Sequence, residues 1–327
     1  MTDSAPPDTD GAPTLAQVAA HAGVSPITVS RVVRLPDMVA AGTRERVEAA
    51  MRALGYVPNL VAGSLASART RAVGVLVPTV ANAIFADTIQ GISDALEPLG
   101  YAVFLAQSRY DNRREEKMLA ALLGRRPEAL IMVGSPATAS GSQMLRRARI
   151  PVVETWDLPV DPIDAVAGFD NHAAGAMVAT HFASAGRRRL AFIGGDDPRA
   201  IRRWTGFCQA AQEAGLEPPQ RLVLARNAGA GLHAGAGLAR CDAAFAANDA
   251  LAIGVLAGLR QTGRRVPEDI ALVGLGDLEI GRLIEPSLST VRIDGEAIGQ
   301  AAGRLTVSRE GPRRIDLGFT LLARHTG

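Results

Sequence analysis

The 327-residue sequence lacks the features that mark several large classes of protein. It has only two cysteines, Cys208 and Cys241, too few for a disulfide framework or a cysteine metal site. No apolar run reaches the roughly 18 residues that a membrane-spanning helix needs, so we expect no membrane partner. The five histidines show no metal spacing, and we expect no metal ion.

Catalytic motifs are missing as well. The chain contains no Gly-x-Ser-x-Gly elbow, no P-loop and no His-Glu-x-x-His. Residues 274–276 read Gly-Leu-Gly, but the dinucleotide-binding pattern is incomplete there and lies late in the chain. We therefore expect a protein that is not an enzyme and has no cofactor.

Length and composition favour a multidomain α/β protein. A chain of this length implies two or three domains, and 47% hydrophobic residues with 34 glycines suit an α/β fold. Residues 1–13 are rich in proline and aspartate and carry no basic and apolar signal pattern. We expect them to form a disordered tail, and we expect the protein to be cytoplasmic.

Residues 14–34 are the most informative segment, because they predict two short helices joined by a tight turn. Thr14 and Gln17 have the spacing of a capping box. Gly23 can adopt the positive φ that ends a helix. Ser25 is a good N-cap, and Pro26 suits the first position of the second helix.

The second helix divides into an apolar face and a polar face. Val29, Val32 and Val33 lie on the buried side, and the other side carries Ile27, Thr28, Ser30, Arg31 and Arg34. This division is typical of a helix that reads the DNA major groove, where Arg31 could pair with guanine O6 and N7. Ser25, Thr28 and Ser30 suit phosphate oxygens, and Pro26 and Ile27 suit a thymine methyl group. The alternative is an ordinary amphipathic helix pair with solvated arginines.

Charge favours the DNA-binding interpretation. Residues 14–71 hold seven arginines against three carboxylates, whereas the whole chain has a net charge of only +2. A third helix is predicted over 43–54, followed by a weak helical stretch over 60–68 that contains Gly63. Positive charge concentrated in one small module is typical of nucleic-acid binding.

These residues resemble the lactose-repressor/galactose-repressor family of bacterial transcription factors, most clearly over 14–34, 43–47 and 54–59. Gln17 stands where the family usually has Asp. The resemblance implies a DNA-binding domain over 14–59 and a hinge helix with linker over 60–71, in which Leu65 wedges into the minor groove. It also adds Thr14, Tyr56, Asn59 and Ala62 to the DNA-binding residues.

After residue 71, strands and helices alternate, which predicts parallel sheets. Strands are expected over 72–78, 101–106, 129–133, 151–154 and 166–169, and then over 189–194, 221–225, 242–246 and 269–275. Two such series predict two doubly wound lobes with a ligand cleft at the carboxyl ends of the strands.

The expected fold is therefore α/β: an N-terminal all-α helix-turn-helix headpiece and a two-lobed, periplasmic-binding-protein-like core over 72–327. By the resemblance, the first lobe covers about 72–186 and 293–310. The second lobe covers about 187–292 and 311–327, so the chain crosses near residues 186, 292 and 311.

The resemblance also implies which residues contact a small-molecule effector: Pro78, Asn82, Ile84, Phe85, Asp170, Asn171, Arg203, Asn248 and Gly276. Phe85 could instead be plain core, Asn248 a helix cap and Asp170 part of a turn. Arg203 is the most informative of the set, because an arginine inside a cleft needs an anionic or polyhydroxyl partner.

Two differences from the family pattern, and a closer resemblance to one subgroup of the family, indicate the chemistry of the effector. Gly276 replaces an aspartate that the family often uses to bind sugar hydroxyls, and residues 226–240 lack an aromatic side chain to stack on a sugar ring. Residues 27–34, 82–86, 150–154 and 168–171 resemble the gluconate-utilisation repressors. The implied effector is gluconate or a related sugar acid, with or without a phosphate.

The predicted function is that of a DNA-binding transcriptional regulator, a repressor controlled by this effector. A homodimer would place two headpieces on a pseudo-palindromic double-stranded operator. Because no heptad tail follows the core, we expect a dimer rather than a coiled-coil tetramer. The alternatives are a regulator that responds to a neutral sugar or nucleoside, and a transport-type sugar-binding protein, which would need export and would have no use for residues 14–71.

Overall fold

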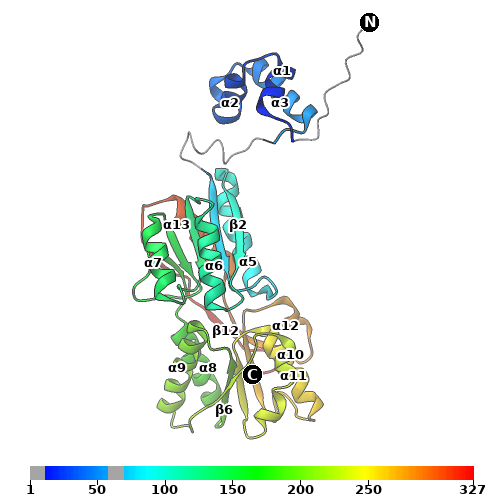
Figure 1. Ribbon diagram of the computed structural model, residues 1–327. Coiled ribbons are helices and arrows are strands. Elements are labelled where there is room, and N and C mark those ends of the chain that lie inside the picture. Colours follow the sequence, from blue (N-terminus) through cyan, green and yellow to red (C-terminus); the bar gives the residue numbers. More distant parts are fainter. Residues whose placement is uncertain (1–11, 58–69) are drawn as a thin grey trace. The chain divides into compact units, whose positions relative to one another are not determined.

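The computed structural model describes residues 12–57 and 70–327 of the chain. Two compact units separate between Thr70 and Arg71. We call the described part of the first unit the headpiece and the second unit the core, and Figure 1 labels the elements of both.

The headpiece consists of α1 (Leu15–Ala22), α2 (Pro26–Arg34), the 3₁₀ turn η1 (Pro36–Met38) and α3 (Ala41–Leu54). Thr14 and Gln17 form the predicted capping box: the Gln17 N–H donates to Thr14 Oγ1 at 3.3 Å, and the Thr14 N–H donates to Gln17 Oε1 at 2.7 Å. Gly23 ends α1 with φ of 64°, the left-handed conformation that glycine adopts without strain. The helix-turn-helix predicted from these residues is thereby confirmed.

Three helices share one small apolar core in the headpiece. Its buried members come from α1, α2 and α3, and they are Val18, Ala19, Val29, Val32, Val47 and Ala50. Val33, which the apolar pattern assigned to the buried face, is only half-buried. Each buried valine contributes roughly 1.5–3 kcal/mol, so this cluster holds α2 on the other two helices and leaves its outer face exposed.

The first lobe of the core is a parallel six-stranded sheet in the order β11-β5-β4-β3-β1-β2. The strands are β1 (Ala72–Val77), β2 (Ala102–Gln107), β3 (Ala129–Val133), β4 (Val152–Thr155), β5 (Ala165–Gly168) and β11 (Arg314–Asp316). The surrounding helices are η2 (Ala83–Phe85), α5 (Ala86–Leu96), η3 (Glu97–Leu99), α6 (Asn112–Leu123), α7 (Ala139–Ala148) and α13 (Gly295–Val307).

Helices cover both faces of this sheet: α5 packs on α13, and α6 packs on α7 (Figure 1). Neighbouring residues of β1 point to opposite faces. Val75 belongs to the cluster that contains Ile92 of α5, whereas Leu76 belongs to the cluster that contains Leu119 of α6. The strand is buried on both sides, as a doubly wound sheet requires.

The second lobe repeats this plan, with a six-stranded sheet in the order β12-β10-β9-β8-β6-β7 in which only β12 is antiparallel. The strands are β6 (Leu190–Gly194), β7 (Gln220–Val223), β8 (Ala243–Ala246), β9 (Ala271–Leu275), β10 (Ser289–Arg292) and β12 (Thr320–Leu322). The helices are α8 (Asn171–Ser184), α9 (Pro198–Glu213), α10 (Ala228–Leu232), η4 (Gly235–Leu238), α11 (Asp249–Gln261) and α12 (Glu279–Leu283). Helix α8 packs on α9, and α10 packs on α11.

The chain crosses between the lobes at places that differ in part from the expected ones. The first crossing lies between β5 and α8, before residue 171 rather than near 186, because α8 packs against α9 of the second lobe. The second lies between β10 and α13. The third follows β11 rather than residue 311, because Arg314–Asp316 pair with β5 and so extend the first sheet.

Candidate functional site

The outer surface of α2 carries the residues predicted to read DNA. Ser25, Pro26, Ile27, Arg31 and Arg34 are exposed, and Thr28 and Ser30 are half-buried. The Ile27 side chain is 71% exposed, so it can contact another molecule. Within the described residues, neither Arg31 nor Arg34 forms an ion pair, so both guanidinium groups are available to an external anion.

Two of the predicted hydroxyl contacts also have structural tasks. Ser25 Oγ accepts the N–H of Thr28 at 3.2 Å and lies 2.9 Å from Thr28 Oγ1, so it caps α2. Thr14 caps α1 in the same way, and half-buried Tyr56 packs against the headpiece core. Asn59, Ala62 and Leu65, together with most of the expected hinge, lie outside the described residues.

The core contains a cavity between its two lobes. The first lobe contributes Asn82, Ile84, Phe85, Tyr110 and Trp156, and the second contributes Asp197, Arg199, Arg203, Arg226, Ala247, Asn248 and Leu275. Each of these residues lies at or after the carboxyl end of a strand, either in the loop that follows the strand or in the first turns of the next helix. This is the expected position of a ligand site in a doubly wound fold.

Five of the nine predicted effector residues line this cavity: Asn82, Ile84, Phe85, Arg203 and Asn248. Pro78, Asp170, Asn171 and Gly276 do not. Pro78 is buried after β1, and exposed Asp170 caps α8 by accepting the N–H groups of His172 and Ala173. Asn171 accepts a hydrogen bond from the lining residue Arg203, and Gly276 lies against the lining residue Ile84, so both lie behind the cavity wall.

Three arginines converge on the second-lobe side of the cavity. Arg199 and Arg203 lie one turn apart on α9 and are 8% and 7% exposed, while Arg226 follows β7. Arg203 donates from Nη1 to Asn171 Oδ1, and its Nε is buried without a partner among the described residues. Burial lowers the pKa of Arg203 to about 10, although Asp197 favours its charged form, so the side chain stays charged at neutral pH.

Among the described residues that line the cavity, only Asp197 carries a carboxylate. Its Oδ2 accepts hydrogen bonds from Arg226 Nε at 3.0 Å and Nη2 at 2.8 Å, and its Oδ1 lies 3.7 Å from Arg199 Nε. Burial opposes its ionisation, but the positive charges of Arg199, Arg203 and Arg226 outweigh burial and lower its pKa to about 2. The cavity therefore holds three cationic groups and one anionic group at neutral pH.

The first lobe supplies an aromatic wall that faces these arginines. The Arg199 guanidinium carbon lies 5.5 Å from the centre of the Phe85 ring, and that of Arg226 lies 3.9 Å from the centre of the Tyr110 ring. Phe85 packs edge-on against Trp156 at 5.2 Å. The lack of aromatic residues in 226–240 thus does not argue against a sugar ring, because the aromatic side chains come from the other lobe.

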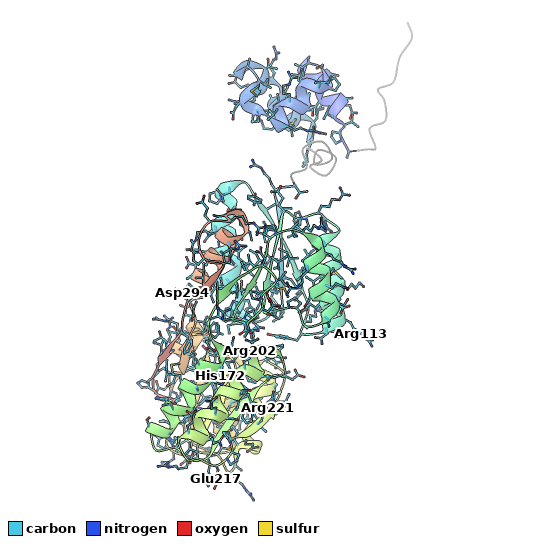
Figure 2. The ribbon with its side chains drawn as sticks, turned by 90° about the vertical axis from the view of Figure 1, so that its left-hand side faces the viewer. Arg113, His172, Arg202, Glu217, Arg221 and Asp294 are labelled. Carbon is cyan, nitrogen blue, oxygen red and sulfur yellow. The ribbon has the colours of Figure 1, made fainter. Side chains whose placement is uncertain are left out.

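Further polar contacts join the lobes beside the cavity. Arg202 Nε lies 3.4 Å from Asp157 Oδ2, and Figure 2 shows Arg202 where the two lobes meet. Asn171 Nδ2 donates to the backbone oxygen of Trp156 at 2.9 Å and to Asp157 Oδ1 at 3.0 Å. The same Asn171 side chain also accepts the hydrogen bond from Arg203, so it links that arginine to the loop after β4.

Tyr110, Trp156, Asp197, Arg199 and Arg226 were not among the effector residues predicted from the sequence. Asp197 and Arg199 belong to the segment after β6 that also contains Arg203. Tyr110 follows β2 and Arg226 follows β7, so the same strand-end rule, applied to these two edge strands, would have found both.

Within the described ranges, no helix is long and apolar enough to span a bilayer. In the same part of the chain, histidine, cysteine, aspartate and glutamate form no group that could hold a metal ion.

Comparisons with known proteins match both the headpiece and the core. The family described as bacterial regulatory proteins, lacI family, matches residues 14–59, and a periplasmic binding protein-like domain matches residues 179–320. The HTH-type transcriptional regulator GntR of Pseudomonas aeruginosa is 36% identical over 97% of this chain and 96% of its own.

Two solved structures match nearly the whole chain. A LacI-family transcriptional regulator from Silicibacter pomeroyi is 32% identical, with a TM-score of 0.88 over 96% of this chain and 98% of its own. The lac repressor dimer bound to operator and the anti-inducer ONPF is 26% identical, with a TM-score of 0.82 over 97% of this chain and 99% of its own.

The fold and the two sites define a class of protein: a helix-turn-helix DNA reader joined to a two-lobed ligand-binding core. The chain belongs to the LacI family of bacterial regulatory proteins and is a DNA-binding transcriptional regulator. The similar proteins are regulators and not enzymes, in agreement with the function predicted from the sequence.

Proposed function

We propose that this regulator is a repressor whose affinity for operator DNA is controlled by a sugar acid such as gluconate or a phosphorylated relative. One observation carries the proposal: the guanidinium groups of Arg199 and Arg203 are buried, and the nearest lining carboxylate, Asp197, pairs with Arg199 and Arg226 and forms no ion pair with Arg203 within the described residues. A buried cation without a full set of partners is costly, so an anionic ligand in this cavity would be strongly favoured.

The rest of the cavity suits the polyhydroxyl part of such a ligand. Asn82 Oδ1 and Asn248 Oδ1 each cap a backbone N–H, of Ile84 and Leu251, at 3.3 and 2.8 Å. Their amide NH₂ groups have no partner within the described residues and can donate to sugar hydroxyl oxygens. The aromatic wall of Phe85 and Trp156 offers apolar surface to the carbon chain of the ligand. The GntR name of the P. aeruginosa relative suggests the same effector.

The proposed mechanism couples this cavity to the DNA-reading helix. Two subunits pair through their cores, and their headpieces bind a pseudo-palindromic operator in the bacterial cytoplasm. Arg31 contacts a base edge, Arg34 and the hydroxyls of α2 contact phosphates, and residues 60–71 form the hinge, with Leu65 in the minor groove. An effector that bridges both lobes changes their angle and hence the spacing of the hinges, and by linkage it binds less tightly to the DNA complex.

The test measures DNA affinity with and without gluconate, on an operator that the protein itself selects from random duplexes. Gluconate should weaken binding of the wild-type protein, and Arg203→Gln should bind the operator normally but respond no longer. Arg265→Gln is the matched control, because Arg265 is an exposed arginine that pairs with Asp269 outside the cavity. A response only to neutral sugars or nucleosides, or an unchanged response in Arg203→Gln, would overturn the proposal.

A further inference from the structure

Arg226 occupies an unusual position in the cavity, because three neighbours hold its guanidinium group in place. Two of its N–H groups bind one oxygen of Asp197, and its planar group lies over the ring of Tyr110. A Cβ on Gly195 would overlap the same guanidinium, so the absence of a side chain at Gly195 makes room for it. Arg226 Nη1 has no hydrogen-bond partner among the residues that the structure describes, which leaves two donors for a ligand.

Asp197 already has partners at both of its oxygens, and Arg226 Nη1 forms no hydrogen bond with either of them. Oδ2 accepts the two hydrogen bonds from Arg226, and Oδ1 accepts the N–H of Ala200 at 3.2 Å at the start of α9. Asp196 Oδ1 lies 3.4 Å from Arg226 Nη2, but the Asp196 side chain is 82% exposed and water screens its charge. Asp197 is therefore a fixed counter-ion that positions Arg226.

The charge balance of the cavity distinguishes between ligands with one and with two anionic groups. Arg199, Arg203 and Arg226 face one lining carboxylate, so a ligand with a single negative charge leaves one guanidinium group uncompensated. A second anionic group on the ligand neutralises the cavity. Because unpaired charge is most costly where water is excluded, the difference matters most in the closed cleft between the lobes.

We propose that Arg226 binds a second anionic group of the effector, so that the effector is a sugar acid with a phosphate ester or a second carboxylate. This inference rests on the proposed function of the cavity. Arg199 and Arg203 hold the first carboxylate, and Arg226 is the specificity-determining residue for the second group. Tyr110, Asp197 and Gly195 are positioning residues that act through Arg226.

Calorimetric titration of the full chain with three probes tests this assignment: gluconate with one negative charge, glucarate with two carboxylates, and 6-phosphogluconate with a carboxylate and a phosphate. In the wild-type protein, at least one of the two doubly anionic acids should bind about tenfold or more tightly than gluconate, since a charge-assisted hydrogen bond accounts for roughly that factor. A preference for only one of them identifies whether the second group is a phosphate or a carboxylate.

Three variants separate Arg226 from a general effect on the cavity. Arg226→Gln should remove most of the preference over gluconate, and Arg226→Lys should restore part of it. Gly195→Ala should weaken the preference while the arginine is still present, because the added methyl group displaces the guanidinium. Arg265→Gln, outside the cavity, is the control and should keep the wild-type preference. Thermal unfolding of each variant confirms that the core is folded.

The outcomes also separate this inference from the proposed function. Gluconate binding at least as tightly as both doubly anionic acids would overturn the role of Arg226 but leave a sugar-acid effector standing. An equal loss of affinity for all three probes in Arg226→Gln would have the same consequence. Binding of none of the three acids would overturn both proposals.

Discussion

Gly276 of the second lobe lies directly against Ile84 of the first. A Cβ on Gly276 would come within 3.2 Å of Ile84 Cγ1 and Cδ1, and the residue has φ of 132°, a conformation that favours glycine. The neighbouring Asp277 is buried and paired with Arg282 and Arg324, so its carboxylate is not free for a ligand. At this point the cleft has neither the room nor the backbone for an aspartate that would bind sugar hydroxyls.

Gly276→Asp should therefore weaken binding of sugar acids. The new side chain both strains the backbone, at about 1–3 kcal/mol, and separates the lobes at Ile84, so we expect at least a tenfold loss of affinity by calorimetry. Gly215→Asp is the control for an aspartate at a glycine of positive φ without a close neighbour, because Gly215 has φ of 68° and nothing within 4 Å of its Cβ position. Equal affinities for the two variants would contradict the close approach of the lobes as the cause.

Nine of the twelve strands in the described residues, and five of the twelve residues that line the cavity, could be predicted from local patterns. Asn82 and Asn248 follow buried strands, and such positions point to a ligand site without knowledge of the tertiary structure. Tyr110 and Arg226 also follow strands. Their place in the site becomes clear only from the contact between them and from the hydrogen bond of Arg226 to the Asp197 carboxylate. Those contacts join residues that are distant in the chain, and the periodicity of a sequence does not predict such contacts.

The lobe boundaries were harder to predict for a related reason. The position of helix α8 is decided by its close contact with α9. A Cβ on Gly175 of α8 would overlap the backbone oxygen of Arg203, so two glycine-lined helix surfaces meet there. Helical periodicity identifies a buried face but does not identify the surface that covers it.

The acidic side chain of Asp249 should make the stability of the core depend on pH. Asp249 is fully buried at the start of α11, where its oxygens accept the Thr290 hydroxyl at 2.6 Å and the Leu278 N–H at 2.8 Å. Burial raises its pKa from 3.8 to about 6, against the effect of these hydrogen bonds. The folded core thus binds this proton more tightly than the unfolded chain does, so the contribution of Asp249 to stability is complete below pH 3.8 and is lost as the pH rises through 6.

Asp249→Asn carries no titrating proton and can still donate to Thr290 and accept from Leu278. The free energy of unfolding of the variant, relative to wild type, should rise by roughly 2–3 kcal/mol between pH 4 and pH 7.5. Urea unfolding at these two pH values measures the difference. Asp87→Asn, which removes an exposed carboxylate from α5, should show no such change, and the same pH dependence in both variants would exclude Asp249 as its source.

Arg31→Ala should reduce specific more than non-specific DNA binding. Arg31 is exposed on α2 and unpaired within the described residues, as expected of a side chain that reads a base edge. Loss of a bidentate contact to guanine costs roughly 1–3 kcal/mol on the operator. Fluorescence anisotropy on the selected operator and on a scrambled duplex, at one fixed salt concentration, measures both affinities. Equal losses on the two duplexes would mean that Arg31 contacts only phosphate.

Asn171→Asp should fill the place of the ligand's carboxylate from within the protein. Asn171 is 1% exposed and accepts the hydrogen bond from Arg203, so a carboxylate at this position pairs with Arg203 directly. It also lies in the first turn of α8, where negative charge is favourable. We expect at least a tenfold loss of affinity for gluconate by calorimetry, because the new anion competes with the ligand for Arg203.

Asn171→Ala separates the added charge from the lost amide. This variant leaves Arg203 without its partner and also removes the hydrogen bonds to the Trp156 oxygen and Asp157, so the core should unfold at a lower urea concentration. In Asn171→Ala the charge of Arg203 is nevertheless uncompensated. Gluconate should therefore bind the Asn171→Ala variant more tightly than the Asn171→Asp variant. If both variants lose the same affinity, Asn171 acts only by holding the lobes together, and Arg203 is not the group that receives the ligand's carboxylate.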